Sequence, residues 1–490
     1  MIDSREIARN NLSSSGYQML IGGAWTTSGK TFAVNNPATG EHLTEVPDAS
    51  PQDVRAAIDS ASKALPAWSS MPAPSRGAIL RKIAALLMER QERLATVMTL
   101  EQGKPLAESR GEIAFTASFF AWYAGEAERI YGQSIPASVP NKRLMVILQP
   151  VGVCAMITPW NFPAAMLARK VAPALAAGCT VVAKPAEQTP LSAIEIAAVC
   201  ADAGLPSGVF NLITTNDPGM FSDEIYADTR VRKVSFTGST EVGKMLLRRS
   251  ADHVKRVSLE LGGNAPFIVF DDASLDAALT GAIASKYRNN GQTCVCANRI
   301  FVQRGIYEKF ADAFTARVKG LHVGNGLDAA TIIGPLINAE AFDKVQRHVA
   351  DATKNGARVL TGGAAFEQAG LKGAFWTPTV LANARADMMV AREETFGPVA
   401  PLIPFESEEE VIRLANDTQY GLAAYFYSRD YARVIRVSEA LEYGIIGAND
   451  ALPAVAQAPF GGYKESGLGR ESGSVGMDAY LEVKYISIGL

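Results

Sequence analysis

Two thiols stand one residue apart in the stretch Arg288–Arg299, which reads RNNGQTCVCANR. Cys294 follows a glycine and a polar cluster, and Cys296 is the second thiol. Thiols in such a pattern could bind a metal, form a redox pair or supply a covalent nucleophile. The other residues of the chain must decide among these chemistries.

The metal chemistry lacks ligands. A structural zinc site uses four Cys or His side chains, whereas no histidine lies near Cys294 in the sequence and the chain has no second closely spaced pair of thiols. We therefore expect no metal. Cys294 fits a covalent nucleophile, and Cys296 is either a small buried apolar residue or a redox partner.

Glu260 is a candidate general base. It stands between Leu259 and Leu261 in an expected strand, immediately before the Gly-Gly break of SLELGGNAP. A lone carboxylate buried there would be costly without a partner or a task. Burial also raises the pKa of a carboxyl, which suits a base that works near neutral pH.

The stretch Phe236–Lys244, FTGSTEVGK, could bind a nucleotide. It resembles a P-loop, but Met245 replaces the hydroxyl residue that holds Mg²⁺, and Thr240 replaces the central glycine of the dinucleotide fingerprint. What remains is Ser239 with backbone N–H groups at a helix N-terminus. This is either an anion site for a pyrophosphate or a plain N-cap.

Lys184 and Glu187, in KPAE, follow the expected strand Thr180–Ala183. They stand at a carboxyl strand end, where open α/β sheets bind ligands. The pair could hold ribose hydroxyls there, or it could be an exposed loop ion pair. If it binds ribose, Glu187 accepts from a 2′-OH and repels a 2′-phosphate, which favours NAD over NADP.

An α/β scaffold must position these residues, and the pattern from Val151 onward predicts one. Short β-branched runs alternate with helical patterns, which indicates a parallel sheet with crossover helices. The expected strands are Val153–Ile157, Thr180–Ala183, Val209–Ile213 and Lys233–Phe236, and the expected helices are Pro163–Ala177, Thr189–Ala203 and Glu241–Ala251.

A second α/β unit is expected to begin near Arg256. Its strands include Val257–Leu261 and Phe267–Phe270, and its helices are Ser274–Asn289, Tyr307–Lys319, Ala339–Asn355 and Glu408–Asn416. Before the first unit, a capping box at Ser50–Asp53 predicts a helix that ends before Pro66. Two more helices are expected, at Ser75–Gln102 and Ala107–Tyr131.

Two segments would leave open β edges. Residues 132–150 suggest an extended hairpin, and Tyr480–Ser487 an alternating strand at the C-terminus. Exposed edges of this kind are usually covered, so we expect a homo-oligomer.

The composition fits a globular enzyme of two or three domains, with 490 residues, 48 % of them hydrophobic and 20 % charged. A net charge of −3 argues against nucleic acid or an anionic membrane as the partner. The five cysteines and an N-terminus without a secretory signal indicate a reducing, cytoplasmic compartment. The most apolar run, Val151–Ala168, is interrupted by Pro159 and Pro163 and is not expected to span a membrane.

Seven motifs occur in the order and spacing of the aldehyde dehydrogenase superfamily, which the chain resembles over essentially its whole length. They are TPWNFP (158–163), KPAE, FTGSTEVG, LELGG, GQTC, EETFGPV (393–399) and PFGGYKESGLGRE (459–471). The resemblance implies a Rossmann-like cofactor domain (1–131 and 151–255), an α/β catalytic domain (256–455) and a small β oligomerisation element (132–150 and 475–490). It also implies dimers or tetramers.

The resemblance further implies roles for individual residues. Cys294 matches the nucleophile, Glu260 the base, and Asn161 with the Cys294 backbone N–H the oxyanion hole. NAD, or alternatively NADP, would be bound by Thr158, Trp160, Lys184, Glu187, Thr237, Gly238, Ser239, Leu261, Glu394 and Phe396.

Arg169 and Arg288 match positions where succinate-semialdehyde dehydrogenases hold the substrate carboxylate, unless they form structural ion pairs. The CVC pattern resembles a reversible redox switch of that subfamily. Ala454 stands where that subfamily usually has a serine. The resemblance therefore implies an anionic semialdehyde, with succinate semialdehyde first. Glutarate, 2-oxoglutarate, sulfonated or phosphonated analogues, neutral aldehydes and a non-catalytic redox-sensing role are the alternatives.

Overall fold

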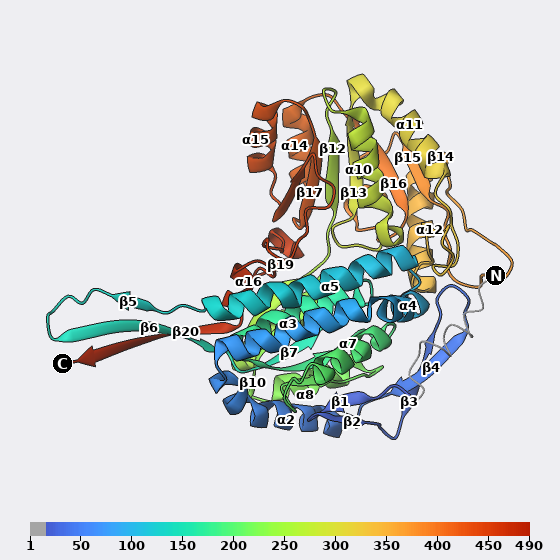
Figure 1. Cartoon of the computed structure of the whole chain (residues 1–490). Coiled ribbons are helices and arrows are strands. Elements are labelled where there is room, and N and C mark those ends of the chain that lie inside the picture. Colours follow the sequence, from blue (N-terminus) through green and yellow to red (C-terminus); the bar gives the residue numbers. More distant parts are fainter. Residues whose placement is uncertain (1–15) are drawn as a thin grey trace.

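The computed structural model describes residues 16–490 (Figure 1). The expected absence of a secretory signal concerns residues 1–15 and lies outside the described residues. Within residues 16–490, no helix is both long enough and apolar enough to cross a lipid bilayer.

The first long helix, α2 (Pro51–Ser70), begins at the predicted capping box. Ser50 Oγ accepts from the Asp53 backbone N–H, and the Asp53 carboxylate accepts from the Ser50 N–H at 2.8 Å. The prediction that this helix ends before Pro66 is wrong. Pro66 lies on the exposed side of the helix, whereas Trp68 is 1 % exposed, so burial of the indole outweighs the lost hydrogen bond.

The predicted helix Ser75–Gln102 is in fact two helices, α3 (Ala73–Glu89) and α4 (Gln91–Gln102). Arg90 between them leaves helical geometry (φ −99°, ψ 12°), and all residues from Leu94 to Gln102 are then buried. Helix α5 (Leu106–Glu126) and the 3₁₀ turn η1 (Ala127–Arg129) follow. The break thus lets α4 turn into the protein interior.

The predicted parallel sheet is present as the centre of an eight-stranded sheet, in the order β19-β11-β10-β7-β8-β9-β1-β2. Strands β7 to β11 are parallel, and β1, β2 and β19 are antiparallel to their neighbours. Chain order reverses between β7 and β10, where open parallel sheets bind dinucleotides. The strands are β1 (Met19–Ile21), β2 (Ala24–Thr26), β7 (Val153–Ile157), β8 (Thr180–Lys184), β9 (Phe210–Leu212), β10 (Val231–Thr237), β11 (Arg256–Glu260) and β19 (Gly467–Leu468).

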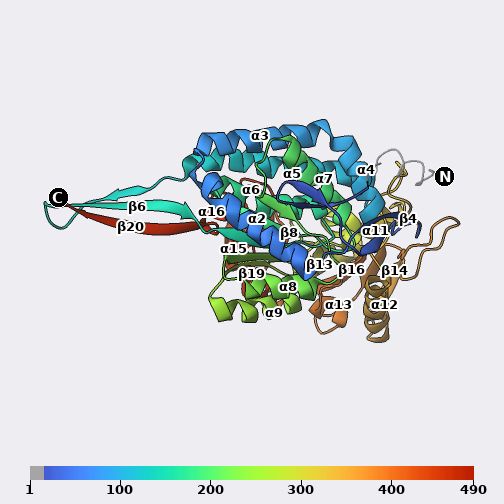
Figure 2. The same ribbon diagram turned by 90° about the horizontal axis from the view of Figure 1, so that it is seen from below.

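Helices cover both faces of this sheet (Figures 1 and 2). One apolar core joins one face to α3, α4, α5, α6 (Pro163–Ala177) and α7 (Pro190–Asp202). Another joins the opposite face to α2, α8 (Pro218–Ala227) and α9 (Thr240–Ser250). Prolines in the first turns of α6 and α7, and left-handed Gly178 after α6, explain why the predicted bounds agree to within one residue.

Strand β11 corrects the expected division of the chain. The assignment of Val257–Leu261 to the second unit is wrong, because β11 pairs with β10 from Arg256 to Glu260. Which strand another strand pairs with depends on tertiary packing, and local sequence pattern does not report it. The pairing places Glu260 beside Thr237 at the carboxyl edge of the first sheet.

A second sheet of seven strands has the order β14-β15-β16-β13-β12-β17-β18 and is parallel except for β14. Helices α10 and α11 pack on one face, and α12 to α15 share a separate core on the other. The strands are β12 (Ala265–Val269), β13 (Ala297–Gln303), β14 (Arg358–Thr361), β15 (Thr379–Ala382), β16 (Val399–Phe405), β17 (Ala423–Tyr427) and β18 (Ile445–Ala448). The helices are α10 (Leu275–Tyr287), α11 (Tyr307–Lys319), α12 (Ala339–Lys354), α13 (Met389–Arg392), α14 (Glu408–Asn416) and α15 (Tyr431–Ala440).

The predicted hairpin and C-terminal strand pair with each other in an arm that extends from the body (Figure 1). It contains β5 (Gln133–Ile135), β6 (Lys142–Pro150) and β20 (Leu481–Gly489). β6 and β20 are antiparallel from Pro150↔Leu481 to Lys142↔Gly489. Smaller elements are the hairpin β3 (Thr31–Asn35) and β4 (His42–Pro47), α16 (Val475–Asp478), η2 (Ala251–His253), η3 (Arg288–Gly291), η4 (Arg304–Ile306) and η5 (Lys464–Ser466).

Candidate active site

Cys294 lies in the loop that leads from α10 to β13. Asn289, Asn290 and Gly291 have successive positive φ values of 48°, 57° and 74°, a left-handed run that asparagine and glycine tolerate best. This run ends α10 two residues before the predicted Asn289. The loop brings the half-buried Cys294 to the lining of two separate cavities.

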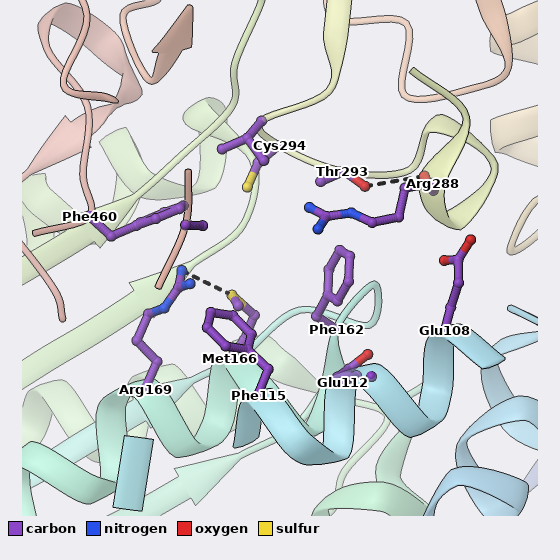
Figure 3. A pocket seen from close by; sticks show the side chains of 13 residues that line it. Glu108, Glu112, Phe115, Phe162, Met166, Arg169, Arg288, Thr293, Cys294 and Phe460 are labelled. Atoms are coloured by element: carbon purple, nitrogen blue, oxygen red, sulfur yellow. Dashed lines mark hydrogen bonds between the residues drawn. The ribbon is translucent and has the colours of Figure 1, made fainter. Parts of the chain in front are cut away.

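The first cavity has a volume of about 280 Å³ (Figure 3). Helices α5 and α6 supply one wall, and the loop of Cys294 and the segment around Phe460 supply most of the rest. Its lining residues are Glu108, Gly111, Glu112, Phe115, Phe162, Met166, Arg169, Arg288, Thr293, Cys294, Val295, Ala454 and Phe460. Arg169 and Arg288 are thus brought together with Cys294, and Ala454 with its missing hydroxyl faces the same space.

The two arginines of this cavity lack acidic partners. No carboxylate in residues 16–490 forms a salt bridge with either guanidinium within 4.0 Å. Arg288 Cζ lies 5.4 Å from the Phe162 ring centroid, and Arg169 Cζ lies 3.9 Å from that of Phe460. Neither arginine forms the structural ion pair that was the alternative.

Arg169 is nearly fully buried, at 2 % exposure. Its Nη1 donates to Met166 Sδ at 3.7 Å, and its Nε has no partner in the described structure. Burial lowers the pKa of this guanidinium. A guanidinium held by aromatic rings and one weak bond to sulfur has spare donors for an anion.

Although Cys294 is only half-buried, the protein around it raises the pKa of its thiol to about 12 by desolvation. Arg169 and, more weakly, Arg288 oppose this effect, because their positive charges favour the thiolate. The two arginines therefore act on the Cys294 thiol as well as on the cavity.

Glu260 ends β11 in a nearly closed environment, at 3 % exposure. Its Oε2 has no hydrogen-bond partner within residues 16–490, and burial, followed by the charge of Glu471, raises its pKa well above the usual range. A Cβ on Gly461 would lie 2.9 Å from Glu260 Oε1, and Gly461 has a φ of +153°. Glycine is therefore needed for PFGG to pass this carboxyl.

Asn161 lies in the loop between β7 and α6. Its side-chain Nδ2 donates to the Gln292 carbonyl at 3.0 Å, two residues before Cys294. Asn161 and Cys294 both line the second cavity. One amide hydrogen of Asn161 points to the loop of Cys294, and the second is left over for another acceptor.

The second cavity, of about 430 Å³, follows the carboxyl edge of the first sheet at the β7/β10 switch point. The structure brings seven of the predicted cofactor residues to this cavity. They are Trp160, Thr237, Gly238, Ser239, Leu261, Glu394 and Phe396. Ser239 caps α9 by accepting from the Val242 N–H at 3.3 Å. Thr237 Oγ1 is buried without a partner among the described residues, so the cavity retains a free hydroxyl.

Phe396 and Glu394 in the lining of this cavity have unusual properties, a positive φ and a raised pKa respectively. Phe396 has a φ of +55°, and its ring meets Trp160 edge-on at 5.6 Å between centroids. Glu394 Oε1 accepts from the Gly263 N–H at 3.0 Å, and burial raises the pKa of its carboxyl to about 7. Backbone strain of this kind is often maintained at ligand sites.

Lys184, Glu187 and Thr158 are not among the residues that line the second cavity. Glu187 lines an adjoining cavity of about 460 Å³, and Ile337 lines both. Lys184 Nζ lies 3.2 Å from Glu187 Oε2, and Thr158 donates its N–H to the Lys184 carbonyl at 3.1 Å. The three residues thus form one group beside the cavity, with Thr158 Oγ1 buried and unpaired within the described chain.

Cys296 lies apart from both cavities. Its Sγ donates to the Lys286 carbonyl at 3.4 Å, and burial raises its pKa. Cys294 and Cys296 are both free thiols. The redox role of Cys296 stays a prediction.

Sequence reasoning missed a set of buried charges around the site. Lys104 pairs with Glu112 at 2.6 Å, and Lys170 pairs with Glu471 at 2.5 Å. One signal could have found part of this set, because Glu108 and Glu112 stand four residues apart on one face of an otherwise aromatic helix. The Lys170–Glu471 pair spans 301 residues of sequence, and no local pattern reports it.

The chain is similar to known proteins over nearly its whole length. The model of the aldehyde dehydrogenase family matches residues 25–486. The chain is 55 % identical to the succinate-semialdehyde dehydrogenase [NADP(+)] GabD of Escherichia coli, over 96 % of this chain and 98 % of that protein. It is 53 % identical to a glutarate-semialdehyde dehydrogenase of Pseudomonas aeruginosa, over 96 % and 97 %.

Among solved structures, an E. coli NADP-dependent enzyme superposes with a TM-score of 0.96 at 54 % identity, covering 98 % of this chain and all of that one. The predicted α/β fold is therefore confirmed. The chain is an oxidoreductase that belongs to the aldehyde dehydrogenase family.

Proposed function

We propose that the protein oxidises an anionic semialdehyde to its carboxylic acid with NAD or NADP, through a thioester on Cys294. The observation that carries the proposal is the position of Cys294. It lies where a cavity with two arginines lacking acidic partners meets a cavity at the switch point of a dinucleotide-binding sheet.

Cys294 Sγ passes its proton to water, and the thiolate then adds to the aldehyde carbon. Arg169 and Arg288 favour the thiolate that this step needs. The addition creates an oxyanion, for which the free hydrogen of Asn161 Nδ2 and the Cys294 backbone N–H are the proposed donors. A donor of this kind contributes about 10²–10³ in rate.

A nicotinamide cofactor fits the second cavity and, when bound, supplies the acceptor for the hydride that the adduct loses. The N-terminus of α9 with Ser239 suits its pyrophosphate. The unpaired Thr237 hydroxyl and the Glu394 carboxyl suit polar groups near the reacting end. Lys184 and Glu187 suit the hydroxyls of the adenosine ribose, with Thr158 behind them.

Glu260 is the proposed base for hydrolysis of the thioester. Its Oε2 has no hydrogen-bond partner among the described residues, but it is buried and Glu260 lines neither cavity, so the side chain must move to reach the water that it deprotonates. Because burial and Glu471 raise its pKa, the basic form becomes more populated as pH rises. Deacylation should therefore quicken toward alkaline pH.

The substrate proposal rests on charge and on space. Two cationic groups without acidic partners in one cavity suit a carboxylate, sulfonate or phosphonate tail. Among the relatives, one acts on succinate semialdehyde and another on glutarate semialdehyde. Ala454 in the wall removes a hydroxyl and adds room, which supports the longer tail.

The proposal also covers the assembly of the protein, its division into domains and its cellular compartment. The arm of β5, β6 and β20 presents exposed Val483 and Tyr485, and we propose that another subunit covers it in a dimer or tetramer. The three-part division is retained, with the boundary after the first sheet moved from 255 to Glu260. The free thiols favour the cytoplasm.

Initial rates decide the function. NADH and NADPH formation is measured with succinate semialdehyde, glutarate semialdehyde and neutral butanal. We expect kcat/KM to be about 10²–10⁴ higher for the anionic aldehydes, since each hydrogen bond to a charged group contributes about 1.5–3 kcal/mol. Equal values for butanal would leave the arginines a structural role, and absence of turnover with all three would overturn the proposal.

A further inference from the structure

The turn that carries Asn161 is held by a buried ion pair between Lys104, in the connection from α4 to α5, and Glu112 of α5. Lys104, between α4 and α5, donates from Nζ to the Asn161 carbonyl and to Glu112 Oε2, both at 2.6 Å. Glu112 Oε1 accepts from the backbone N–H groups of Ala164 at 3.0 Å and Ala165 at 3.2 Å. The pair thus grips both sides of the Asn161–Pro163 turn.

The pair makes four hydrogen bonds, and each one constrains the direction of the groups that it joins. The side chains of Lys104 and Glu112 are 0 % and 1 % exposed, and two ions buried so completely gain little net stability over an apolar pair. Glu112 satisfies N–H groups that the first turn of α6 leaves unpaired, and Lys104 Nζ also lies 4.0 Å from the Phe162 ring centroid. What the ions provide is fixed geometry.

Residues 102–112 also contact the loop that carries Cys294. Glu108 Oε2 accepts from the Asn289 N–H at 2.8 Å, and Gln102 Nε2 donates to Asn289 Oδ1 at 3.1 Å. Asn289 Nδ2 in turn donates to the Asn161 carbonyl at 2.9 Å. Residues 102–112 therefore set the position of Asn161 relative to the loop of Cys294.

We propose that Lys104, backed by Glu112, is a positioning residue for the oxyanion hole. It holds the Asn161 carbonyl so that the Asn161 side-chain amide keeps one hydrogen on Gln292 and presents the other beside Cys294. Lys104 does not line either cavity at Cys294, so it acts through Asn161. The inference rests on the proposed function, because it assigns Asn161 to the oxyanion.

A double-mutant cycle tests this role. Lys104→Met is measured alone and in an Asn161→Ala background, with saturating cofactor and semialdehyde. We expect kcat to fall about 10- to 100-fold in the first case with KM changed less than about threefold, and to change less than about threefold in the second. Equal fold losses in both backgrounds would overturn the proposal.

Two controls separate positioning from damage to the fold. Lys255→Met removes another buried lysine, whose Nζ donates to the Asp228 and Val231 carbonyls at 2.7 Å, and it should lower Tm without lowering kcat. Alkylation of Cys294 by iodoacetamide, a neutral reagent, should proceed at an unchanged rate in Lys104→Met. If Lys104→Met fails to fold, Glu112→Gln takes its place in the same cycle, because it keeps an acceptor for the α6 N–H groups.

A cofactor-free assay distinguishes failure of this proposal from failure of the proposed function. When Cys294 attacks p-nitrophenyl acetate, the carbonyl oxygen of the ester becomes an oxyanion, as the carbonyl oxygen of an aldehyde does. If the wild type oxidises no aldehyde, the proposed function fails, and the cycle is repeated on ester hydrolysis. If Lys104→Met slows ester hydrolysis only when Asn161 is present, the positioning role is supported. If it slows hydrolysis equally with and without Asn161→Ala, the role is overturned.

Discussion

The two cavities that meet at Cys294 differ in the polar groups they leave free. In the first, Glu108 and Glu112 already accept from Asn289, Lys104 and the start of α6, so the donors of Arg169 and Arg288 remain. In the second, the Thr237 hydroxyl and one oxygen of Glu394 remain. One side of the thiol is thus built to receive an anion, and the other to receive groups that donate hydrogen bonds.

This difference orients the substrate. An ionic tail that entered the second cavity would meet Glu394, whereas in the first it meets two guanidinium groups. The aldehyde carbon then lies where the two cavities meet, beside Cys294 and Met166, which line both. Changes to either cavity should therefore alter one ligand and spare the other.

The largest expected effect comes from the shared point. Cys294→Ala removes the nucleophile, so NADH formation should fall by at least about 10⁴-fold with every aldehyde. Cofactor affinity, measured by calorimetry, should stay within about threefold of wild type. Retained turnover would mean that the two cavities do not meet at the reacting atom.

Breaking the anion-receiving side should be selective. Arg288→Ala removes the guanidinium that is proposed to donate hydrogen bonds to the substrate carboxylate. The value of kcat/KM for succinate or glutarate semialdehyde should therefore fall about 10- to 100-fold. Butanal provides the matched control, with an expected change of less than about threefold. A comparable loss for butanal would show that Arg288 acts on Cys294 or on the loop instead.

Breaking the cofactor side should alter the choice of cofactor. Glu187→Ser removes a negative charge that would face a 2′-phosphate, so the ratio of kcat/KM for NADP to that for NAD should rise about tenfold. Asp252→Ser, which removes an exposed carboxylate that lines neither the second nor the adjoining cavity, serves as a control and should leave the ratio unchanged. A ratio that stays constant in Glu187→Ser would place the ribose elsewhere.

Local signals in the sequence predicted much of the fold. Helix α6 begins at Pro163 and ends before left-handed Gly178, and both signals are carried by the residues themselves. The pairing of β11 with β10, in contrast, is decided by packing between distant segments. The same reason explains why Pro66 did not end α2, since the burial of Trp68 is a tertiary effect.

The candidate site divides in the same way. Cys294, Glu260 and Asn161 stand in motifs that can be read directly, and the structure brings Asn161 and Cys294 to one cavity. Lys104 was missed because it stands 57 residues from the Asn161 carbonyl that it holds, and it carries no motif of its own. Whether two charges meet is a property of the fold, so a sequence indicates candidate reacting residues more easily than the residues that position them.

The smallest expected effect sharpens the comparison through pH. Burial raises the pKa of Glu394 to about 7, and only its carboxylate form accepts hydrogen bonds with both oxygens. Cofactor affinity should therefore increase about three- to tenfold as pH rises from 6 to 8, and Glu394→Gln should bind with the weaker, pH-independent affinity. Calorimetric titration of cofactor at both pH values measures this. Affinity for a substrate-like anion such as succinate, which binds on the arginine side, should not follow the same curve, and a shared pH dependence would mean that the two cavities are electrostatically one.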